Sequence, residues 1–261
     1  MDLSNALLDL NNVRVMRGDK VVLDDFNLRI HAHEHVAILG PNGCGKSTLV
    51  KTITREVYPV VHENSSIRIF GKDRWDVFTL RSMLGVISND LMSACTGDIR
   101  GREVVLSGFF SSTKIFPHHV IEPAQKTLAD LALAQVQILH LADRPVSEMS
   151  SGEARRVLIA RALVHQPRAL LFDEPSNSLD FTARQSLHQS MSILAKSGTG
   201  IVMVTHDLAD IVPEIERVVL MFKGRIMADG HKEEILQSDR LSDLFGIPVE
   251  IARKDGLYHL W

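Results

Sequence analysis

The chain contains the stretch Val36-Ala-Ile-Leu-Gly-Pro-Asn-Gly-Cys-Gly-Lys-Ser-Thr48, in which a short apolar run leads directly into a glycine-rich loop. Residues 40–48 match the pattern G-x-x-x-x-G-K-[ST], and residues 46–53 continue as a helix. Glycines let backbone N–H groups wrap around phosphate oxygens, and the helix points its positive end at them. The bare pattern should arise by accident in on the order of one chain in a hundred of this length. The flanking strand and helix therefore favour a phosphate-binding loop over a chance glycine-rich turn.

Two side chains of this loop have specific expected roles. Lys46 would reach the β- and γ-phosphates of a nucleotide, and the Ser47 hydroxyl would bind Mg²⁺. The residues expected to contact the nucleotide here are Gly40, Pro41, Asn42, Gly43, Cys44, Gly45, Lys46, Ser47 and Thr48. A helix N-terminus lowers a thiol pKa, so Cys44 allows a redox role, but a spacer position that accepts many small residues is the simpler interpretation.

Composition sets the class of protein. The chain has 261 residues, of which 45% are hydrophobic and 23% charged, as in an ordinary globular protein with one large domain or a domain with a sub-lobe. The net charge of −3 gives no global attraction to nucleic acid. Two cysteines, Cys44 and Cys95, provide no disulfide framework and suit a reducing compartment. The N-terminus lacks a signal-peptide pattern, and no run of about 18 apolar residues occurs, so we expect no membrane span.

The order of strand and helix patterns predicts an α/β fold. Residues 8–15 and 21–30 read as strands joined by a turn at Gly18-Asp19. Further strands are expected at 36–39, 66–70, 85–88, 169–172, 201–204 and 218–221. Residues 89–164 instead show helical spacing, notably at 124–141, and no convincing strand. This pattern predicts a mainly parallel sheet covered on both faces, with 1–88 and 165–261 as its core and 89–164 as an inserted helical lobe.

Polar residues follow two of these strands. Asp173 and Glu174 come directly after the apolar run 169–172, and His206 follows the run 201–204. Ligands in such sheets bind beyond the carboxyl ends of the strands. Asp173 is therefore expected to hold the Mg²⁺ water shell, Glu174 to orient or deprotonate the attacking water, and His206 to contact the γ-phosphate. Each would pass for a solvated strand end by itself, but the phosphate loop in the same chain favours the catalytic interpretation.

Together these segments resemble the ATP-binding-cassette ATPase domain over nearly the whole chain. The resemblance rests on an ordered set of motifs: GPNGCGKST, MSSGE, LLFDEP, SNSLD and VTHD. It implies a P-loop NTPase (RecA-like) core with an antiparallel β subdomain and an inserted α-helical subdomain. It also implies a head-to-tail dimer, in which the signature motif of one copy, MSSGE at residues 149–153, closes on ATP held by the other. The residues that would act in trans are Ser150, Ser151, Gly152 and Glu153, with Asp180 in the adjoining loop at the dimer interface.

The chain departs from the family pattern at three places. Ser151 and Glu153 stand where the family usually has glycine and glutamine. Ser151 keeps its N–H, whereas Glu153 places a negative charge near the phosphates. Arg17 lies near the position where an aromatic residue normally stacks on adenine, and its guanidinium plane would stack there instead. Asn89 aligns with the glutamine that contacts Mg²⁺ in the family but is one methylene shorter, so it would act through a water or couple differently.

The resemblance implies an ATP-hydrolysing subunit of a transporter, with ATP and Mg²⁺ as ligands. Its catalytic residues would be Lys46, Glu174 and His206, and its metal-binding residues Ser47, Asp173 and Asn89. Its partners would be a second copy and a transmembrane permease on the cytoplasmic face of a membrane, without direct contact to nucleic acid. The tail at 241–249 looks like tails of importer ATPases for molybdate or chelated iron.

The sequence allows two competing functions, and three other features have more than one interpretation. A soluble cassette protein would use the same dimer switch on nucleic acid, the ribosome or another protein. A module that only senses ATP is disfavoured, because both Glu174 and His206 are present. Residues 31–35 carry three alternating histidines, which suit either a metal site or, more simply, a turn before a buried strand. The apolar stretch 109–117 is either core or a docking surface for a membrane subunit. Arg155 and Arg156 read as a solvated or interfacial helix face rather than a nucleic-acid patch.

Overall fold

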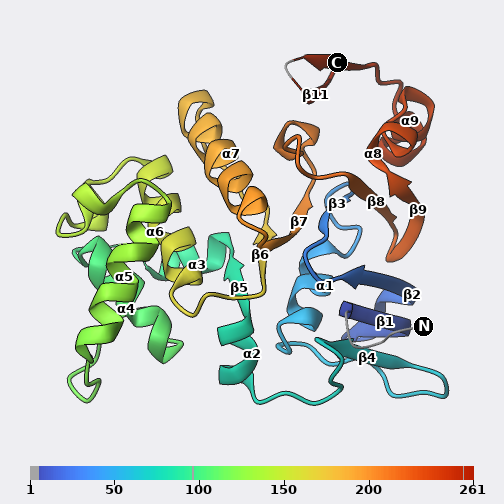
Figure 1. Cartoon of the computed structure of the whole chain (residues 1–261). Helices are drawn as coiled ribbons and strands as arrows, with labels where there is room; N and C mark the ends of the chain where they lie inside the picture. The colour runs from blue at the N-terminus through green and yellow to red at the C-terminus, as the bar shows by residue number, and fades with distance from the viewer. Residues whose placement is uncertain (1–5, 96, 255) are drawn as a thin grey trace. The chain divides into compact units, whose positions relative to one another are not determined.

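The computed structural model describes residues 6–95, 97–254 and 256–261 (Figure 1). The chain forms two compact units: the first joins the chain up to Val77 with Gly200–Trp261, and the second is Phe78–Thr199. Both units contain parallel strands and helices, and the first also contains an antiparallel sheet. The mixed α/β class predicted from the sequence is therefore confirmed. No helix among the described residues is long and apolar enough to cross a membrane.

The first unit is built around the strand that precedes the phosphate loop. Strand β3 (His35–Leu39) pairs in parallel with β7 (Gly200–Thr205) on one side and with β8 (Arg217–Phe222) on the other. Strand β9 (Arg225–His231) adds to β8 in the antiparallel sense. The apolar run 36–39 has no exposed surface, as expected of a central parallel strand covered on both faces. Helix α1 (Lys46–Ile53) follows β3 after the glycine-rich loop.

A three-stranded antiparallel sheet makes up the rest of the N-terminal part. Its order is β2 (Lys20–His31), β1 (Ala6–Arg17) and β4 (Ser66–Ile69). The chain reverses between β1 and β2 at Gly18, whose φ of 58° lies in the left-handed region that glycine adopts without strain. Between β2 and β3, the backbone at His33 also has a positive φ, so the alternating histidines lie around a turn.

The C-terminal part of the first unit follows β9. Helices α8 (Lys232–Ile235) and α9 (Ser238–Phe245) lead to a hairpin of β10 (Ile251–Lys254) and β11 (Leu257–Leu260). A short 3₁₀ turn, η5 (Leu208–Asp210), follows β7 and contacts β11.

The second unit combines a pair of parallel strands with several helices. Strand β5 (Leu84–Ile87) pairs in parallel with β6 (Ala169–Asp173). The long helices are α5 (Pro123–Gln135), α6 (Ser151–Leu163) and α7 (Phe181–Lys196). Shorter helical segments are α2 (Val77–Met83), α3 (Asn89–Ala94), α4 (Gly101–Ser107), η2 (Gly108–Phe110), η3 (Leu139–Leu141) and η4 (Val146–Glu148). Helix α6 packs against α4, α5 and α7, which makes it the central helix of this unit.

Several sequence-based predictions of elements need correction. The helix expected at 124–141 is interrupted, because α5 ends at Gln135 and Gln137 adopts a φ of 60°, which an α-helix cannot contain. Strand β9 and the hairpin β10–β11 were not predicted at all.

Phe109 and Phe110 of the apolar stretch lie half-buried in η2, where the Phe110 ring stacks on His119 with the ring centroids 4.0 Å apart.

Candidate nucleotide site

The phosphate loop has the geometry of an anion cradle. Helix α1 begins at Lys46, and its N-cap, Gly45, has a φ of 114° and no side chain to bond the first N–H groups of the helix. The first N–H groups of a helix point out of its N-terminus, which is how helix N-termini bind phosphate. Gly40 leaves no room for a side chain, because an added Cβ would lie 2.3 Å from the Met221 carbonyl oxygen. The loop residues thus fit the triphosphate of a nucleotide.

The polar side chains of the loop differ in exposure. Lys46 is buried, and its Nζ donates to the carbonyl oxygens of Gly40 at 2.7 Å and Pro41 at 3.2 Å. The ammonium group is therefore held against the loop by main-chain oxygens. Ser47 is exposed, and its hydroxyl is of the oxygen-donor type that Mg²⁺ prefers. Cys44 is buried, with its thiol packed close to Gly40.

The turn between β8 and β9 supports the phosphate loop. The N–H of Gly224 donates to the Cys44 carbonyl oxygen at 2.8 Å, and the Gly224 carbonyl oxygen accepts from the N–H of Asp24 at 3.1 Å. Gly224 has a φ of 77°, and a Cβ there would lie 2.1 Å from the Val22 carbonyl oxygen. Sequence reasoning missed this contact, although the glycine between two apolar runs is a recognisable hairpin signal.

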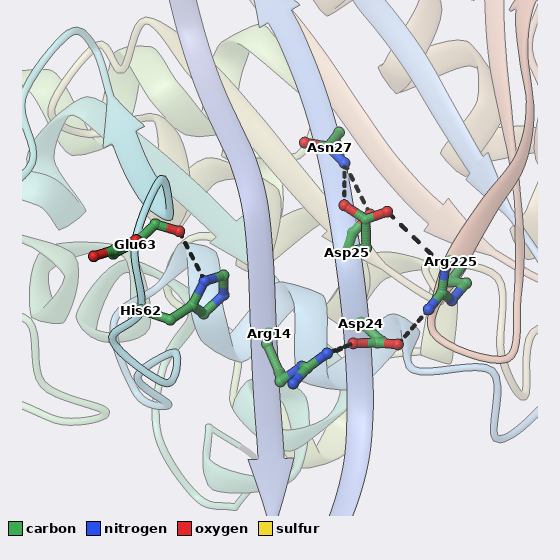
Figure 2. A network of polar contacts seen from close by, with 7 residues as sticks. All are labelled: Arg14, Asp24, Asp25, Asn27, His62, Glu63 and Arg225. Carbon is green, nitrogen blue, oxygen red and sulfur yellow. Dashed lines mark hydrogen bonds and ion pairs between the residues drawn. The ribbon is translucent and has the colours of Figure 1, made fainter.

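An ion-pair network joins the same turn to the antiparallel sheet (Figure 2). Asp24 on β2 pairs with Arg14 on β1 at 2.7 Å and with Arg225 at the start of β9. Both arginines donate hydrogen bonds to this carboxylate, which lowers the pKa of Asp24 below its usual value. Beside it, Asn27 donates to Asp25 on the same strand, and in a separate contact the His62 ring lies 3.0 Å from the Glu63 carbonyl oxygen. Gly224 and Arg225 thereby hold the β8–β9 turn against β2.

His206 follows directly after β7, next to the phosphate-loop strand. Leu39 of β3 pairs with Thr205 of β7, and the N–H of Gly40 donates to the Thr205 carbonyl oxygen at 3.3 Å. The Thr205 hydroxyl donates to Asp210 at 2.7 Å and accepts from the N–H of Asp207 at 3.0 Å. The chain around His206 is therefore fixed by a buried hydroxyl. Arg17, the residue expected near adenine, is exposed at the end of β1.

The second unit carries the acidic pair. Asp173 is the last residue of β6, and Glu174 follows with a φ of 50°. A non-glycine residue in this region is uncommon and occurs where the surrounding structure holds the backbone in place. Both carboxylates are half-buried, and carboxylate oxygen is a preferred Mg²⁺ ligand, so Asp173 fits the metal role expected of it.

Asn89 lies beside this pair. Ser88 caps helix α3, and Asn89 is its first residue. Its Nδ2 lies 3.4 Å from the Glu174 carbonyl oxygen, to which it donates, and its Oδ1 accepts from Arg155 Nη2 at 2.7 Å. Sequence reasoning identified Asn89, but the solvated helix face that it expected for Arg155 is wrong, because Arg155 is 3% exposed.

The signature motif forms the first turn of α6. Ser150 is the N-cap, its hydroxyl accepts from the N–H of Glu153 at 3.3 Å, and the Glu153 carboxylate accepts from the N–H of Ser150 at 2.8 Å. This reciprocal pair is a capping box. The bond to the Ser150 N–H lowers the pKa of Glu153, so its carboxylate is charged and already bonded to this turn. Ser151 is exposed.

The loop that follows the acidic pair is joined to the signature turn. Asp180 is the N-cap of α7, and its carboxylate accepts from the N–H of Ala183 at 2.8 Å. Gly152 of α6 packs against Ala183, where an added Cβ would approach the alanine Cβ to 2.9 Å. The first turns of α6 and α7 therefore contact each other closely, and Gly152 is required for this packing.

A family model described as ABC transporter matches residues 23–177, which is more than half of the chain. The chain belongs to the ABC transporter family. A hemin import ATP-binding protein, HmuV, from Aliivibrio fischeri is 32% identical over 252 residues, covering 94% of this chain and 93% of the relative. An ABC transporter ATP-binding protein, YlmA, from Bacillus subtilis is 29% identical over 94% of this chain and 93% of the relative.

Solved structures agree with this ABC assignment. cbiO1 from Clostridium perfringens, part of the cbiONQ transporter complex, has a TM-score of 0.77 and 26% identity, covering 92% of this chain and 94% of its own. A putative metal-chelate type ABC transporter in an inward-facing conformation shares the fold, with a TM-score of 0.78 and 23% identity over 98% of this chain and 96% of its own. The chain is therefore an ATP-binding subunit of an ABC transporter, and its activity is ATP hydrolysis.

Proposed function

We propose that this chain energises an importer of a metal chelate or a similar small solute. The observation that supports this is the similarity to a hemin import ATP-binding protein over nearly the full length of both chains. The tail at 241–249, which looks like tails of importer ATPases for molybdate or chelated iron, agrees with it. In this proposal, the chain lies on the cytoplasmic face of a membrane, bound to a transmembrane permease.

We assign the phosphate-binding roles to the first unit. The α1 N–H groups and the Lys46 ammonium hold the β- and γ-phosphates of ATP, and the Ser47 hydroxyl is a ligand of Mg²⁺. His206, fixed by the Thr205 turn, contacts the γ-phosphate. Bound Mg²⁺ neutralises charge on the phosphate oxygens during transfer. Arg17, exposed at the end of β1, stacks on the adenine ring.

We assign the hydrolytic roles to the second unit. Glu174 accepts the proton of a water as the water oxygen attacks the γ-phosphorus. The bond between that phosphorus and the bridging oxygen breaks, and ADP and inorganic phosphate form. Asp173 holds the Mg²⁺ water shell, and Asn89 takes part through its amide. The positive φ of Glu174 supports this assignment, since such backbone conformations cluster at active sites.

Two copies of the chain form the complete ATPase in this proposal. The Ser150–Glu153 turn of one copy closes on ATP held by the loop at 40–48 of the other, because a helix N-terminus attracts the γ-phosphate. Asp180 lies at the interface between the copies. Residues 89–164 form the helical subdomain, and 1–88 with 165–261 form the core. Closing and opening of the dimer is the motion passed to the permease.

Affinity purification from detergent-solubilised membranes tests the transporter assignment. The tagged chain is expected to capture a polytopic membrane protein, and Glu174→Gln to capture it equally while abolishing ATP-driven uptake of an iron chelate by vesicles. Capture of ribosomal proteins or DNA in its place would favour the soluble cassette class. Uptake of an unchelated ion or an unrelated solute by the captured complex would overturn the substrate class alone.

A further inference from the structure

Helix α6 carries a buried arginine whose hydrogen-bond partners, among the residues that the structure describes, lie in the second unit. Arg155 is 3% exposed, and its Nη2 donates to Asn89 Oδ1 at 2.7 Å and to the Asn177 carbonyl oxygen at 3.5 Å. Its Nε and Nη1 have no hydrogen-bond partner among the described residues. One guanidinium group therefore contacts both the first residue of α3 and the turn after Glu174.

Stability alone does not account for this arginine. Moving a guanidinium out of water costs free energy that is offset only when its donors are paired, and two donors of Arg155 are unpaired. An apolar side chain of similar volume would fill the same space without this cost. An unsatisfied buried polar group in a native structure needs an explanation, and a catalytic role is one of those known.

The contacts of Asn89 give that reason. Its amide has two ends, and Arg155 binds the oxygen end, so the nitrogen end faces the Glu174 carbonyl oxygen. Asparagine has a short side chain and arginine a long one, so the arginine spans the distance from α6 to the amide. Without the guanidinium, the amide of Asn89 would be able to rotate and release the main chain of Glu174.

We propose that Arg155 is a positioning residue for ATP hydrolysis, which orients Asn89 and through it the backbone of Glu174. Arg155 also lies two residues after Glu153 of the capping box, on the same helix. It thereby connects the signature turn to the residue that activates water. This inference rests on the proposed role of Glu174 as the general base.

The test compares the steady-state kinetics of Arg155→Met, Asn89→Ala and the double variant. We expect Arg155→Met to lower kcat about tenfold, since small displacements of catalytic groups have effects of this size or more. KM for ATP should change by less than about twofold, because uniform binding is retained. The double variant should be no slower than Asn89→Ala, since Arg155 acts through Asn89.

Three controls separate positioning from a structural role. Arg156→Met makes the same charge change one residue away and should keep kcat within about twofold of the wild type. The Tm of Arg155→Met should lie within about 3 °C of the wild type, since the lost hydrogen bond is offset by removal of a buried charge. Arg155→Lys keeps the charge and much of the reach, so it should recover part of kcat, and it serves if the methionine variant does not fold.

Wild-type kcat in Arg155→Met, or losses that add in the double variant, would overturn the inference. A parallel loss of kcat and Tm in both the methionine and lysine variants would also overturn it. If Glu174 is not the general base, the result is different, because Glu174→Gln would then keep its activity.

Discussion

The phosphate loop of the first unit and the Asn89–Arg155 contacts of the second unit are constructed differently. In the loop, main-chain groups hold nearly everything: Gly40 packs on a carbonyl, Lys46 donates to carbonyls, and Gly224 bonds the carbonyl of Cys44. In the second unit, side chains of Asn89 and Arg155 make the corresponding bonds.

This difference accounts for the phosphate loop, which follows the family pattern, and for the departures at Asn89 and Glu153. Where main-chain groups pack closely, as at Gly40 and Gly224, the residue type is restricted. Only glycine fits there, because a Cβ would meet a carbonyl oxygen. A site made of side chains can satisfy the same geometry with another pair, such as a shorter amide and a longer cation. The departures at Asn89 and Glu153 are both of this second kind, and each has a bonded partner in the structure.

The largest effects are expected from one variant in each region, and the two variants should differ in whether ATP binding is retained. Lys46→Ala should abolish phosphate release and weaken ATP binding, because the role proposed for the ammonium is to contact the phosphates in both ground state and transition state. Glu174→Gln should lower kcat by about 10²- to 10⁴-fold while ATP binding persists, because only proton transfer is lost. Measured phosphate release with nucleotide-binding titrations checks both. Unchanged turnover of Lys46→Ala would mean that the loop is not the active site.

The support of the phosphate loop is tested by Gly224→Ala. The new Cβ would meet the Val22 carbonyl oxygen, at a φ of 77° that alanine adopts only with strain. We expect a loss of about 2–4 kcal/mol in the free energy of unfolding, with reduced ATP affinity.

Gly18→Ala is the matched control, since its φ is 58° and nothing lies within 4 Å of the added Cβ. It should cost about 1 kcal/mol for the positive φ alone. Chemical denaturation measures both. Equal losses in the two variants would show that the β8–β9 turn does not constrain the loop.

A smaller, pH-dependent effect is expected from Asp24→Asn. Its pKa is lowered in the folded state by Arg14 and Arg225, so the ion pairs stabilise the fold above the unfolded pKa of about 4. This contribution is lost as pH falls through the folded pKa. The variant should melt a few degrees lower at pH 7, and the difference from wild type should shrink on acidification. A difference that grows at acidic pH would contradict the assignment.

The smallest effect is expected at the signature turn, from Glu153→Gln. Glutamine keeps the capping box, because its side-chain oxygen also accepts from the Ser150 N–H. Removing one negative charge should improve apparent ATP affinity by less than about threefold, because the charge is already bonded to its own helix N-terminus. Glu153→Ala, which removes cap and charge together, is the comparison. A gain larger than tenfold would show that the carboxylate opposes nucleotide binding directly.

Local signals predicted β3 and α1 of the first unit well. The helix expected at 46–53 begins and ends at those residues, since the glycine-rich loop marks its start. The helix expected at 124–141 failed because Gln137, whose φ is positive, gives no breaker signal in the sequence. Strand β9 was missed because its apolar positions are weak and interrupted by Asp229 and Gly230.

The candidate site shows the same limit. Motifs indicated Lys46, Asp173 and Glu174, and their roles stay predictions. No local pattern connects Arg155 to Asn89, because the contact joins residues 66 positions apart. The Gly224 support of the loop is also long-range, although its hairpin turn was visible in the sequence.

The account depends most on the signature turn of one copy facing the phosphate loop of another. Crosslinking in the Glu174→Gln background measures this directly, with Asn42→Cys in one preparation and Ser151→Cys in a second. Both positions are exposed, and a disulfide between the two new cysteines can only join different copies. We predict that mixing the preparations with ATP and a mild oxidant gives a band of twice the chain mass, and that omitting ATP removes it. Absence of that band while ATP is bound would contradict the account.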